Sequence, residues 1–445
     1  MSWKEVTLGE LLEPRESRIK HEDANTLGLK RIKKIDFSGI IHYEDRTETR
    51  TDMILVKRGD LVVSGINAAK GAIAVHELEE DVLATIHYSS YRFRPDVISS
   101  LYLKWFFRSP QFADLIQDQV PGGIKTEIKS QHLLPLKTRL PSIKEQIDIA
   151  ESLSIIDDYV KELELEIALQ EDVTEKLRLA VLAEAVQGAV TDEWRRNSDQ
   201  GETVEEFLQR IDSTNLAKNC GKKLLPVDAS EFPHQIPKSW TWERLGSLLL
   251  SKPRNGLSLK PVDRVTKTKT LKLSATTSGT FDGSKIKYLD AEIDSDSHLW
   301  LKDGDLLVQR SNSIDFVGTS AIYRGKDNDY IYPDLIMKCR AAAEQSIEYL
   351  HIVLSSPYVR HYFRENATGS AGNMPKINQG VVMNTLIPLP PGKEQIEIVD
   401  RVKRLLEVCR SAKSEQSARQ EMVDQLSTSA ISKAFDSAAC QTKFP

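Results

Sequence analysis

Two stretches of the chain carry apolar residues at the three- and four-residue spacing that forms one face of a helix. Between Ile147 and Val190 these positions are Ile156, Val160, Leu163, Ile167, Leu177 and Val181. Between Ile396 and Phe435 they are Val399, Val402, Leu406, Cys409, Val423 and Leu426. The spacing predicts two seam helices of about 40 residues, each roughly 60 Å long. Each helix is too long to bury its stripe on a compact domain. We therefore expect the two helices to pack together, antiparallel if the halves of the chain face opposite ways.

Gln170 and Gln416 interrupt the two seams near their middles. A polar seam residue can fix the register and the number of helices at a cost in stability. Alternatively, each helix bends or faces water at that point. The pattern leaves both interpretations open.

Each helical stretch begins with almost the same ten residues, LPSIKEQIDI at 140–149 and LPPGKEQIEI at 389–398. Three further pairs of similar segments precede these sequences, in the same order in both halves of the chain. They are VTLGELL at 6–12 with ERLGSLL at 243–249, KRGDLVVS at 57–64 with KDGDLLVQRS at 302–311, and LYLKWFFRSP at 101–110 with EYLHIVLSSP at 348–357. Collinear matches at a slowly rising offset indicate a duplicated unit of about 245 residues.

Within each repeat, a Lys-x-Gly-Asp turn leads into a β-rich run, and a helical pattern is interrupted by Ser-Pro. We therefore expect an α+β protein with two tandem mixed domains, separated by two long antiparallel, coiled-coil-like helices. The predicted divisions are a first domain at 1–141, a central helix at 142–191, a linker at 192–239, a second domain at 240–390, a C-terminal helix at 391–436 and a tail at 437–445. Thr203 and Glu206 predict a capping box over a short helix in the linker. The linker is long enough to return the chain along a helix of roughly 60 Å, as an antiparallel arrangement would need.

Composition narrows the class of protein. The start, MSWKEVTLGE, has no basic region followed by an apolar run, so we expect no secretory signal. Nowhere do about 18 apolar residues run together, which argues against a membrane span. The four cysteines, Cys220, Cys339, Cys409 and Cys440, lie far apart and form no CxxC pair. A disulfide framework or zinc site is therefore not expected, and a cytoplasmic location fits.

The formal net charge of −5 is unevenly distributed. Residues 141–191 carry 4 basic and 12 acidic groups, whereas the two predicted domains are mildly basic. Basic surfaces attract phosphate, so the domains are the candidate nucleic-acid interface. In the first domain the candidate DNA contacts are Lys30, Arg31, Lys33, Lys34, Asn67, Lys70 and Lys125. In the second they are Arg254, Lys260, Arg264, Lys267, Lys269, Arg310, Asn312 and Lys376.

Arg310 and Asn312 stand out among these residues because arginine and asparagine side chains can make bidentate contacts with guanine and adenine edges. Asn67 and Lys70 occupy the matching stretch of the first domain, which reads SGINAAKGA where the second reads QRSNSIDFVG. The alternative interpretation of each basic cluster is an ordinary solvated surface.

A search for catalytic patterns finds no Walker A sequence, no GxGxxG opening a helix, no GxSxG and no Asn/Asp-Pro-Pro-Tyr/Phe site of an amino-methyltransferase. Asp96, Glu127 and Lys129 fit the loose PD…ExK arrangement of metal-dependent nucleases. The pattern is short and degenerate, and the second repeat has NMPKINQG in its place. A metal-dependent DNA nuclease is therefore the alternative hypothesis.

The two LP-x-x-KEQI closures, the GDLLVQRSNS stretch and the IPKSWTWERLG restart together resemble the specificity subunit of type I restriction-modification systems. The resemblance extends from Trp3 to about Phe435. It implies a DNA-recognition subunit with no catalytic site, in which each domain reads one half of a bipartite double-stranded DNA site. The two helices would set the spacing between half-sites and dock two methyltransferase subunits.

The resemblance also implies that no cofactor binds to this chain. S-adenosylmethionine would bind to the methyltransferase partners, and ATP and Mg²⁺ would serve the partner subunits that translocate and cut DNA. The Arg-Ser-Asn triplet of the second domain matches the common form of the family, whereas the first domain carries a variant.

Overall fold

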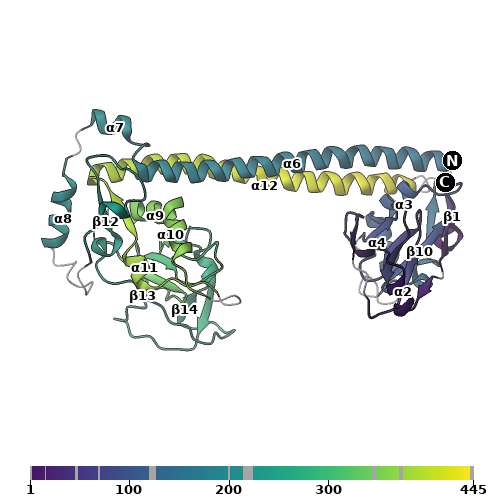
Figure 1. The fold of residues 1–445 in the computed structure, drawn as a ribbon, viewed down its shortest axis with the longest axis horizontal. Helices are drawn as coiled ribbons and strands as arrows, with labels where there is room; N and C mark the ends of the chain where they lie inside the picture. The colour runs from purple at the N-terminus through teal and green to yellow at the C-terminus, as the bar shows by residue number, and fades with distance from the viewer. Residues whose placement is uncertain are drawn as a thin grey trace. The chain divides into compact units, whose positions relative to one another are not determined.

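The computed structural model describes residues 3–15, 17–45, 49–68, 71–119, 127–198, 201–213, 224–342, 347–369 and 374–440 (Figure 1). It divides into two compact units. The first unit comprises Met1–Leu169 and Gln416–Pro445, and the second comprises Gln170–Glu415. Two long helices, α6 (Ile143–Gln187) and α12 (Gly392–Cys440), each contribute one part to each unit. No described helix combines the length and the apolar character that crossing a membrane requires.

The first unit is built around two β-sheets. The four-stranded sheet has the order β2 (Leu12–Pro14), β10 (Tyr88–Phe93), β7 (Leu61–Ser64), β8 (Ile73–Val75). The five-stranded sheet has the order β3 (Arg18–Ile19), β6 (Met53–Val56), β9 (Val82–Thr85), β4 (Arg31–Ile35), β5 (Ile41–Glu44). The short helices are α1 (Leu8–Leu11), α2 (His21–Thr26), α3 (Ser100–Phe107), α4 (Pro110–Gln119) and α5 (Ser130–Leu133). A separate antiparallel pair, β1 (Lys4–Thr7) with β11 (Lys137–Leu140), leads directly into α6.

Among the described residues, the second unit repeats the four-stranded sheet and the separate strand pair of the first unit, but not its five-stranded sheet. Its four-stranded sheet has the order β13 (Arg254–Asn255), β18 (Ile336–Cys339), β16 (Leu306–Gln309), β17 (Ser320–Ile322). The pair β12 (Thr241–Arg244) and β19 (Leu386–Leu389) leads into α12 as β1 and β11 lead into α6. The remaining elements are strands β14 (Thr268–Leu271) and β15 (Ile286–Leu289), helices α7 (Asp192–Asn197), α8 (Val204–Ser213), α9 (Ile347–Ser355), α10 (Pro357–Glu365) and α11 (Gln379–Met383), and the 3-10 turns η4 (Ala229–Glu231), η5 (Leu245–Leu248) and η6 (Leu273–Ala275). The predicted duplication is therefore confirmed at the level of sheet order.

The repeated Gly-Asp turn has the same structure in both units. Gly59 and Gly304 take φ values of 82° and 83°, a left-handed backbone that glycine adopts without steric cost. The following aspartates are buried, and each accepts a backbone N–H three residues earlier, Lys57 N to Asp60 Oδ2 at 3.0 Å and Lys302 N to Asp305 Oδ2 at 2.8 Å. An arginine neutralises each carboxylate: Arg15 Nη2 donates to Asp60 at 2.6 Å. Arg340 Nε donates to Asp305 at 2.7 Å.

The long helices are antiparallel within each unit, as the fold prediction required. In the first unit Val160 of α6 packs on Val423 of α12, and Leu153 shares a hydrophobic core with Phe435. In the second unit the end of α6 meets the start of α12, where Arg401 Nη1 donates to the carbonyl of Val190 at 3.0 Å. The start of each helix thus lies beside the end of the other.

The predicted seams are partly confirmed. Val160, Ile167, Val181, Val402, Cys409 and Val423 are buried, and so is the polar Gln416. The prediction was wrong for Leu163, Leu177 and Leu426, whose exposed fractions are 40%, 50% and 51%. A pair of helices covers a narrower stripe than a full domain core does, so residues at the edge of the apolar face stay in water.

Each long helix begins one residue after the predicted division, and its C-terminal end differs from the prediction by four residues. Helix α6 ends at Gln187 rather than at 191, because Gly188 takes φ 77° and Ala189 N bonds back to Glu184 O at 2.9 Å. Helix α12 continues to Cys440, beyond 436. The division into functional domains stays a prediction.

The linker packs on the second unit in its described part. The predicted capping box is confirmed, since Thr203 N donates to Glu206 Oε2 at 2.8 Å and Glu206 N donates to Thr203 Oγ1 at 3.2 Å. Val204 and Phe207 of α8 are buried in the core of the second unit. The expectation that this segment runs back along a long helix was therefore wrong, because its apolar residues are held where α6 ends.

The repeated KEQ sequence begins both long helices, and its glutamine makes one hydrogen bond that is the same in each. Gln146 Nε2 donates to the carbonyl of Pro141, and Gln395 Nε2 donates to the carbonyl of Pro390, both at 3.0 Å. Both glutamines are buried. Each therefore ties the strand that ends a domain to the helix that follows it.

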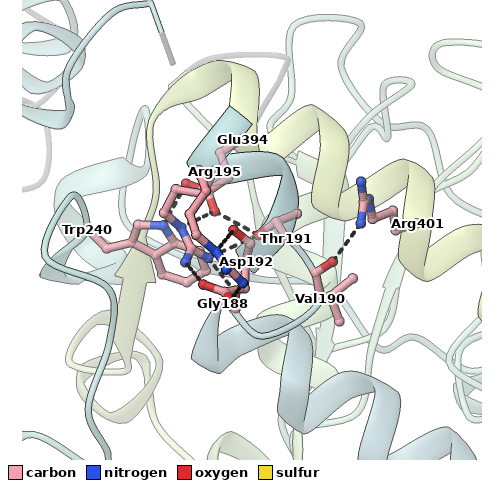
Figure 2. A network of polar contacts seen from close by, with 9 residues as sticks. Gly188, Val190, Thr191, Asp192, Arg195, Trp240, Glu394 and Arg401 are labelled. Atoms are coloured by element: carbon pink, nitrogen blue, oxygen red, sulfur yellow. Dashed lines mark hydrogen bonds and ion pairs between the residues drawn. The ribbon is translucent and has the colours of Figure 1, made fainter. Parts of the chain in front are cut away.

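The glutamates of the two KEQ sequences behave differently. Glu145 closes a capping box with Ser142, whose N and Oγ donate to Glu145 Oε2 at 3.0 and 2.7 Å. The equivalent of Ser142 is Pro391, which has neither an N–H nor a hydroxyl. Glu394 is fully buried and instead accepts hydrogen bonds from three distant groups (Figure 2). The donors are Thr191 Oγ1 at 2.7 Å, Arg195 Nε at 2.9 Å and Trp240 Nε1 at 2.8 Å.

Arg195 completes this network. Its guanidinium also donates to the carbonyl of Gly188 and lies over the ring of Trp240, 5.6 Å from the ring centroid. Figure 2 shows these side chains converging where α6 ends, α7 begins and α12 begins. The buried carboxylate of Glu394 thus joins the start of α12 to Trp240 and to the segment that follows α6, at Thr191 and Arg195.

Candidate nucleic-acid interface

Three segments of the second unit meet at Arg310, immediately after β16. Arg310 N donates to the carbonyl of Leu335 at 2.7 Å, and the carbonyl of Arg310 accepts from Ile377 N at 2.9 Å. An isolated bridge joins Ser311 to Lys376. We call this arrangement, in which the backbone N–H and carbonyl of Arg310 bond to two different segments, the second fork, because it lies in the second unit. It brings together three predicted contacts, because Arg310 and Asn312 follow β16 and Lys376 lies on the adjoining segment.

Hydrogen bonds from buried polar groups hold the loop that follows β16 in the second fork. Gln309 is fully buried, and its Nε2 donates to Leu273 O, Thr276 Oγ1 and Thr277 Oγ1 at 2.9 to 3.0 Å. Asn312 Nδ2 donates to Gln309 Oε1, and Asn312 Oδ1 accepts from Ser313 N, both at 2.7 Å. Asn312 therefore orders this loop, and its predicted base contact stays a prediction.

Arg360 of α10 clamps the far side of the same loop. Its guanidinium donates to the carbonyls of Val317 and Asp315 at 2.7 and 2.8 Å. Burial, together with the nearby charge of Arg364, lowers the pKa of Arg360 to about 10, so the group is still protonated at neutral pH. The loop thus presents a fixed backbone, and Arg310 stays half-buried on it.

The first unit contains an equivalent arrangement, the first fork. Gly65 N donates to the carbonyl of His87 at 2.8 Å, and the carbonyl of Gly65 accepts from Ile128 N at 2.6 Å. Asn67 follows two residues later and is half-buried. The predicted contacts Lys70 and Lys125 lie outside the described residues.

The other basic residues predicted to contact DNA differ in how exposed they are and in whether they form ion pairs. Lys33 and Lys34 are exposed on β4, and Arg254, Lys260 and Lys267 are exposed in the second unit; Arg31 is half-buried. Three more form ion pairs: Lys30 with Glu80 at 2.7 Å, Arg264 with Asp290 at 2.5 Å and Lys269 with Asp329 at 2.5 Å. Lys269 also lies over the ring of Tyr330. Ion pairing reduces the positive field that these three residues present to phosphate.

The residues of the nuclease hypothesis have other partners. Asp96 accepts from Arg94 at 2.9 Å, and this hydrogen bond lowers the pKa of Asp96. Glu127 accepts from His87 at 3.1 Å and lies 3.6 Å from Lys129 Nζ. Within the described ranges, no cluster of three or more histidine, cysteine, aspartate or glutamate side chains is arranged to hold a metal ion.

Known proteins resemble this chain over most of its length, although no family model matches it. The EcoKI type I restriction enzyme specificity subunit of Escherichia coli strain K12 is 26% identical over 345 residues, which are 77% of this chain and 66% of that protein. The Escherichia coli EcoEI specificity subunit is 23% identical over 290 residues, 61% of this chain and 46% of that protein. The chain is a homologue of type I restriction enzyme specificity subunits.

A solved structure supports the fold of this specificity-subunit homologue. It comes from work on complex assembly and conformational transition of the type I R-M system. Its chain has a TM-score of 0.68 at 16% identity, and the match covers 98% of this chain and 97% of that one. The predicted architecture of two mixed domains with long helices is therefore confirmed. The matched part of the homologue spans less than two thirds of both the EcoKI and the EcoEI subunits.

In this specificity-subunit homologue, three residues that support the two forks were not predicted from the sequence. Gln309 and Arg360 support the second fork, and His87 supplies both a carbonyl and a ring nitrogen to the first. Gln309 directly precedes the Arg-Ser-Asn triplet, so the motif itself pointed to it. Arg360 and His87 carried no signal, because their partners lie 43 and 40 residues away in the sequence.

We predict that Arg310→Ala weakens binding to the preferred DNA site by about 1–3 kcal/mol, the usual worth of a bidentate guanine contact. The change relaxes one position of one half-site and leaves the other half-site unchanged. Selection from a randomised DNA pool with wild-type and variant chains measures it. Equal weakening on all sequences would assign Arg310 to a phosphate instead. Lys326→Ala, which removes another positive charge from the second unit, is the charge-matched control.

Proposed function

We propose that this chain is the DNA-recognition subunit of a type I restriction-modification complex. Each unit reads one half of a bipartite double-stranded DNA site. One observation carries the proposal: the two forks share the same pair of backbone hydrogen bonds but carry different side chains. A duplicated frame with unlike side chains suits a protein that reads two unlike half-sites from two ends of one duplex.

The long helices act as the spacer between half-sites in this proposal. Helices α6 and α12 have 45 and 49 residues. At about 1.5 Å per residue, each is roughly 65–75 Å long, a length that suits a rigid ruler on DNA. The KEQ junctions support this role, because they fix each domain to the start of a helix.

The same helices dock two methyltransferase subunits. In the first unit, α6 exposes Ile155, Tyr159, Leu165 and Leu169, with exposed fractions between 58% and 63%. In the second unit, α12 exposes Leu405 and Val408. Large apolar side chains in such numbers on helices that already pack through another face favour a protein partner. The excess of acidic groups in 141–191 keeps this surface away from phosphate.

The chain has no catalytic role and binds no cofactor of its own. S-adenosylmethionine binds to the methyltransferase partners, and ATP and Mg²⁺ serve the restriction subunits. A cytoplasmic location suits a DNA ligand and the free thiols of Cys339 and Cys409. No described cluster and no comparison favours the nuclease alternative.

The proposal is tested with the purified full-length chain and a randomised double-stranded DNA pool. We expect the bound fraction to share two short conserved half-sites separated by an unspecified gap of constant length. We also expect the chain alone neither to cut nor to methylate DNA, with or without Mg²⁺ and S-adenosylmethionine. Mg²⁺-dependent cutting that is lost in Asp96→Ala would instead establish the nuclease.

A further inference from the structure

The two forks can be compared residue by residue because their backbone hydrogen bonds coincide. Gly65 stands where the second unit has Arg310, and His87 stands where it has Leu335. Ile128 and Ile377 are both buried and close their forks in the same way. The residue before each isoleucine is Glu127 in the first unit and Lys376 in the second. Two basic side chains of one fork are thus replaced by a glycine and a carboxylate in the other.

Glu127 occupies the space that a side chain at position 65 would need. A Cβ added to Gly65 would lie 3.1 Å from Glu127 Cγ, and 2.9 and 3.0 Å from the carbonyl oxygens of Ile128 and His87. These distances leave no room for a side chain at position 65. The Glu127 side chain therefore occupies, in the first fork, the space where the Arg310 side chain begins in the second.

The carboxylate is held in place rather than mobile. His87 Nδ1 donates to Glu127 Oε1 at 3.1 Å, and Lys129 Nζ lies 3.6 Å from Oε2. The Glu127 side chain is 36% exposed, and the hydrogen bond from His87 lowers its pKa. At neutral pH it is an ionised group that only accepts hydrogen bonds, with free acceptor positions facing solvent.

Exposed apolar side chains surround both forks. Ile66 and Ile86 flank the first, with exposed fractions of 58% and 48%. Ile314, Phe316 and Met374 lie on the segments that form the second, with exposed fractions between 42% and 47%. In the major groove, polar side chains bond to base edges and apolar ones contact thymine methyl groups, so this combination of side chains suits that groove.

The chemistry of the base edges selects the partner of Glu127. In the major groove, cytosine presents its N4 amino group as a donor, and guanine presents only acceptors, N7 and O6. Adenine presents an N6 donor beside the N7 acceptor, and that acceptor repels a carboxylate. The Lys129 ammonium lies beside Glu127 and is a donor, as the acceptors of the guanine in a cytosine–guanine pair require.

We propose that Glu127 reads a cytosine in the half-site of the first unit, at the position equivalent to the base that Arg310 faces in the second. The inference rests on the proposed function and adds its residue-level specificity. The two half-sites thus differ in sequence because one fork accepts hydrogen bonds where the other donates them.

The test repeats the DNA selection with Glu127→Gln and Glu127→Asp full-length chains. Glutamine makes a bidentate pair with adenine, so the Gln variant should shift one position of one half-site from cytosine toward adenine. We expect preference for cytosine there to fall at least about fivefold. The Asp variant keeps a carboxylate and should keep cytosine. Glu79→Gln, an exposed glutamate of the same unit paired with Arg58 at 3.1 Å, should change neither half-site.

The outcomes separate this inference from the proposed function. If the wild-type chain selects two half-sites and Glu127→Gln leaves both unchanged, the inference is overturned and the proposed function stands. A Gln variant that binds every sequence more weakly by the same factor also overturns it, because Glu127 would then only support the fold. If the wild-type chain selects no half-site, the proposed function fails first and the inference falls with it.

Discussion

Replacing Glu394 with glutamine lowers the free energy of unfolding of the second unit by about 3 kcal/mol or more. The carboxylate is fully buried, and its partner Arg195 is 14% exposed at the side chain. Removing the negative charge leaves the arginine buried beside a neutral amide. The amide nitrogen also cannot accept from one of the three donors, Thr191, Arg195 or Trp240. The effect is large because one side chain serves three segments at once.

Hydrogen exchange of peptides from the second unit measures this change without assuming that the whole chain unfolds in one step. The matched control is Glu145→Gln, the same change in the other KEQ sequence. Glutamine also serves at that position of a capping box, so the control should cost less than about 1 kcal/mol. Equal losses in the two variants would show that the buried network contributes nothing beyond helix capping.

Inserting four residues after Glu171 in α6 lengthens the gap between the two half-sites by one to two base pairs. Four residues are close to one helical turn, so the apolar face is nearly preserved and the helix grows by about 6 Å. B-DNA advances about 3.4 Å per base pair along its helix axis, which converts that length into the expected change of gap. Both half-site sequences should remain those of the wild-type chain.

A two-residue insertion at the same place is the control. It rotates the following residues by about 200°, which turns Val181 away from the seam that Ile167 occupies. We expect this variant to lose selective binding to the bipartite site. Selection from the same DNA pool measures both variants. A four-residue variant that binds with the original gap would show that the helices are not the ruler.

Local patterns in the sequence predicted much of the fold. The apolar spacing located both long helices, and the repeated Gly-Asp turn marked the same strand entry in each unit. Such features depend on neighbours within a few residues, so they are visible in the sequence. The pattern failed at Leu163, Leu177 and Leu426, since the width of the buried stripe depends on how much of each helix its neighbour covers.

The candidate site was predictable to a smaller degree. Matching the repeats paired Asn67 with Asn312 and drew attention to Arg310. The sequence assigned Glu127 to a nuclease hypothesis with Asp96 and Lys129, because the three residues fit the PD…ExK pattern. In the structure Asp96 bonds to Arg94, whereas Glu127 lies against Gly65 and His87. Contacts across tens of residues leave no periodic signal, so the role of Glu127 emerged only from the folded chain.

The KEQ sequences show which features the sequence alone determines and which depend on the tertiary structure. The sequence by itself determined that the motif occurs twice before a long helix, and that Ser142 in one copy is Pro391 in the other. Proline has no donor for a capping box, so Glu394 cannot close the kind of box that Glu145 closes with Ser142. Only the tertiary structure decided which partners Glu394 has instead, because Thr191, Arg195 and Trp240 are 203, 199 and 154 residues away. These three residues lie beside Glu394 because of where α6 ends and where the second domain begins. Those positions follow from the packing of the whole second unit.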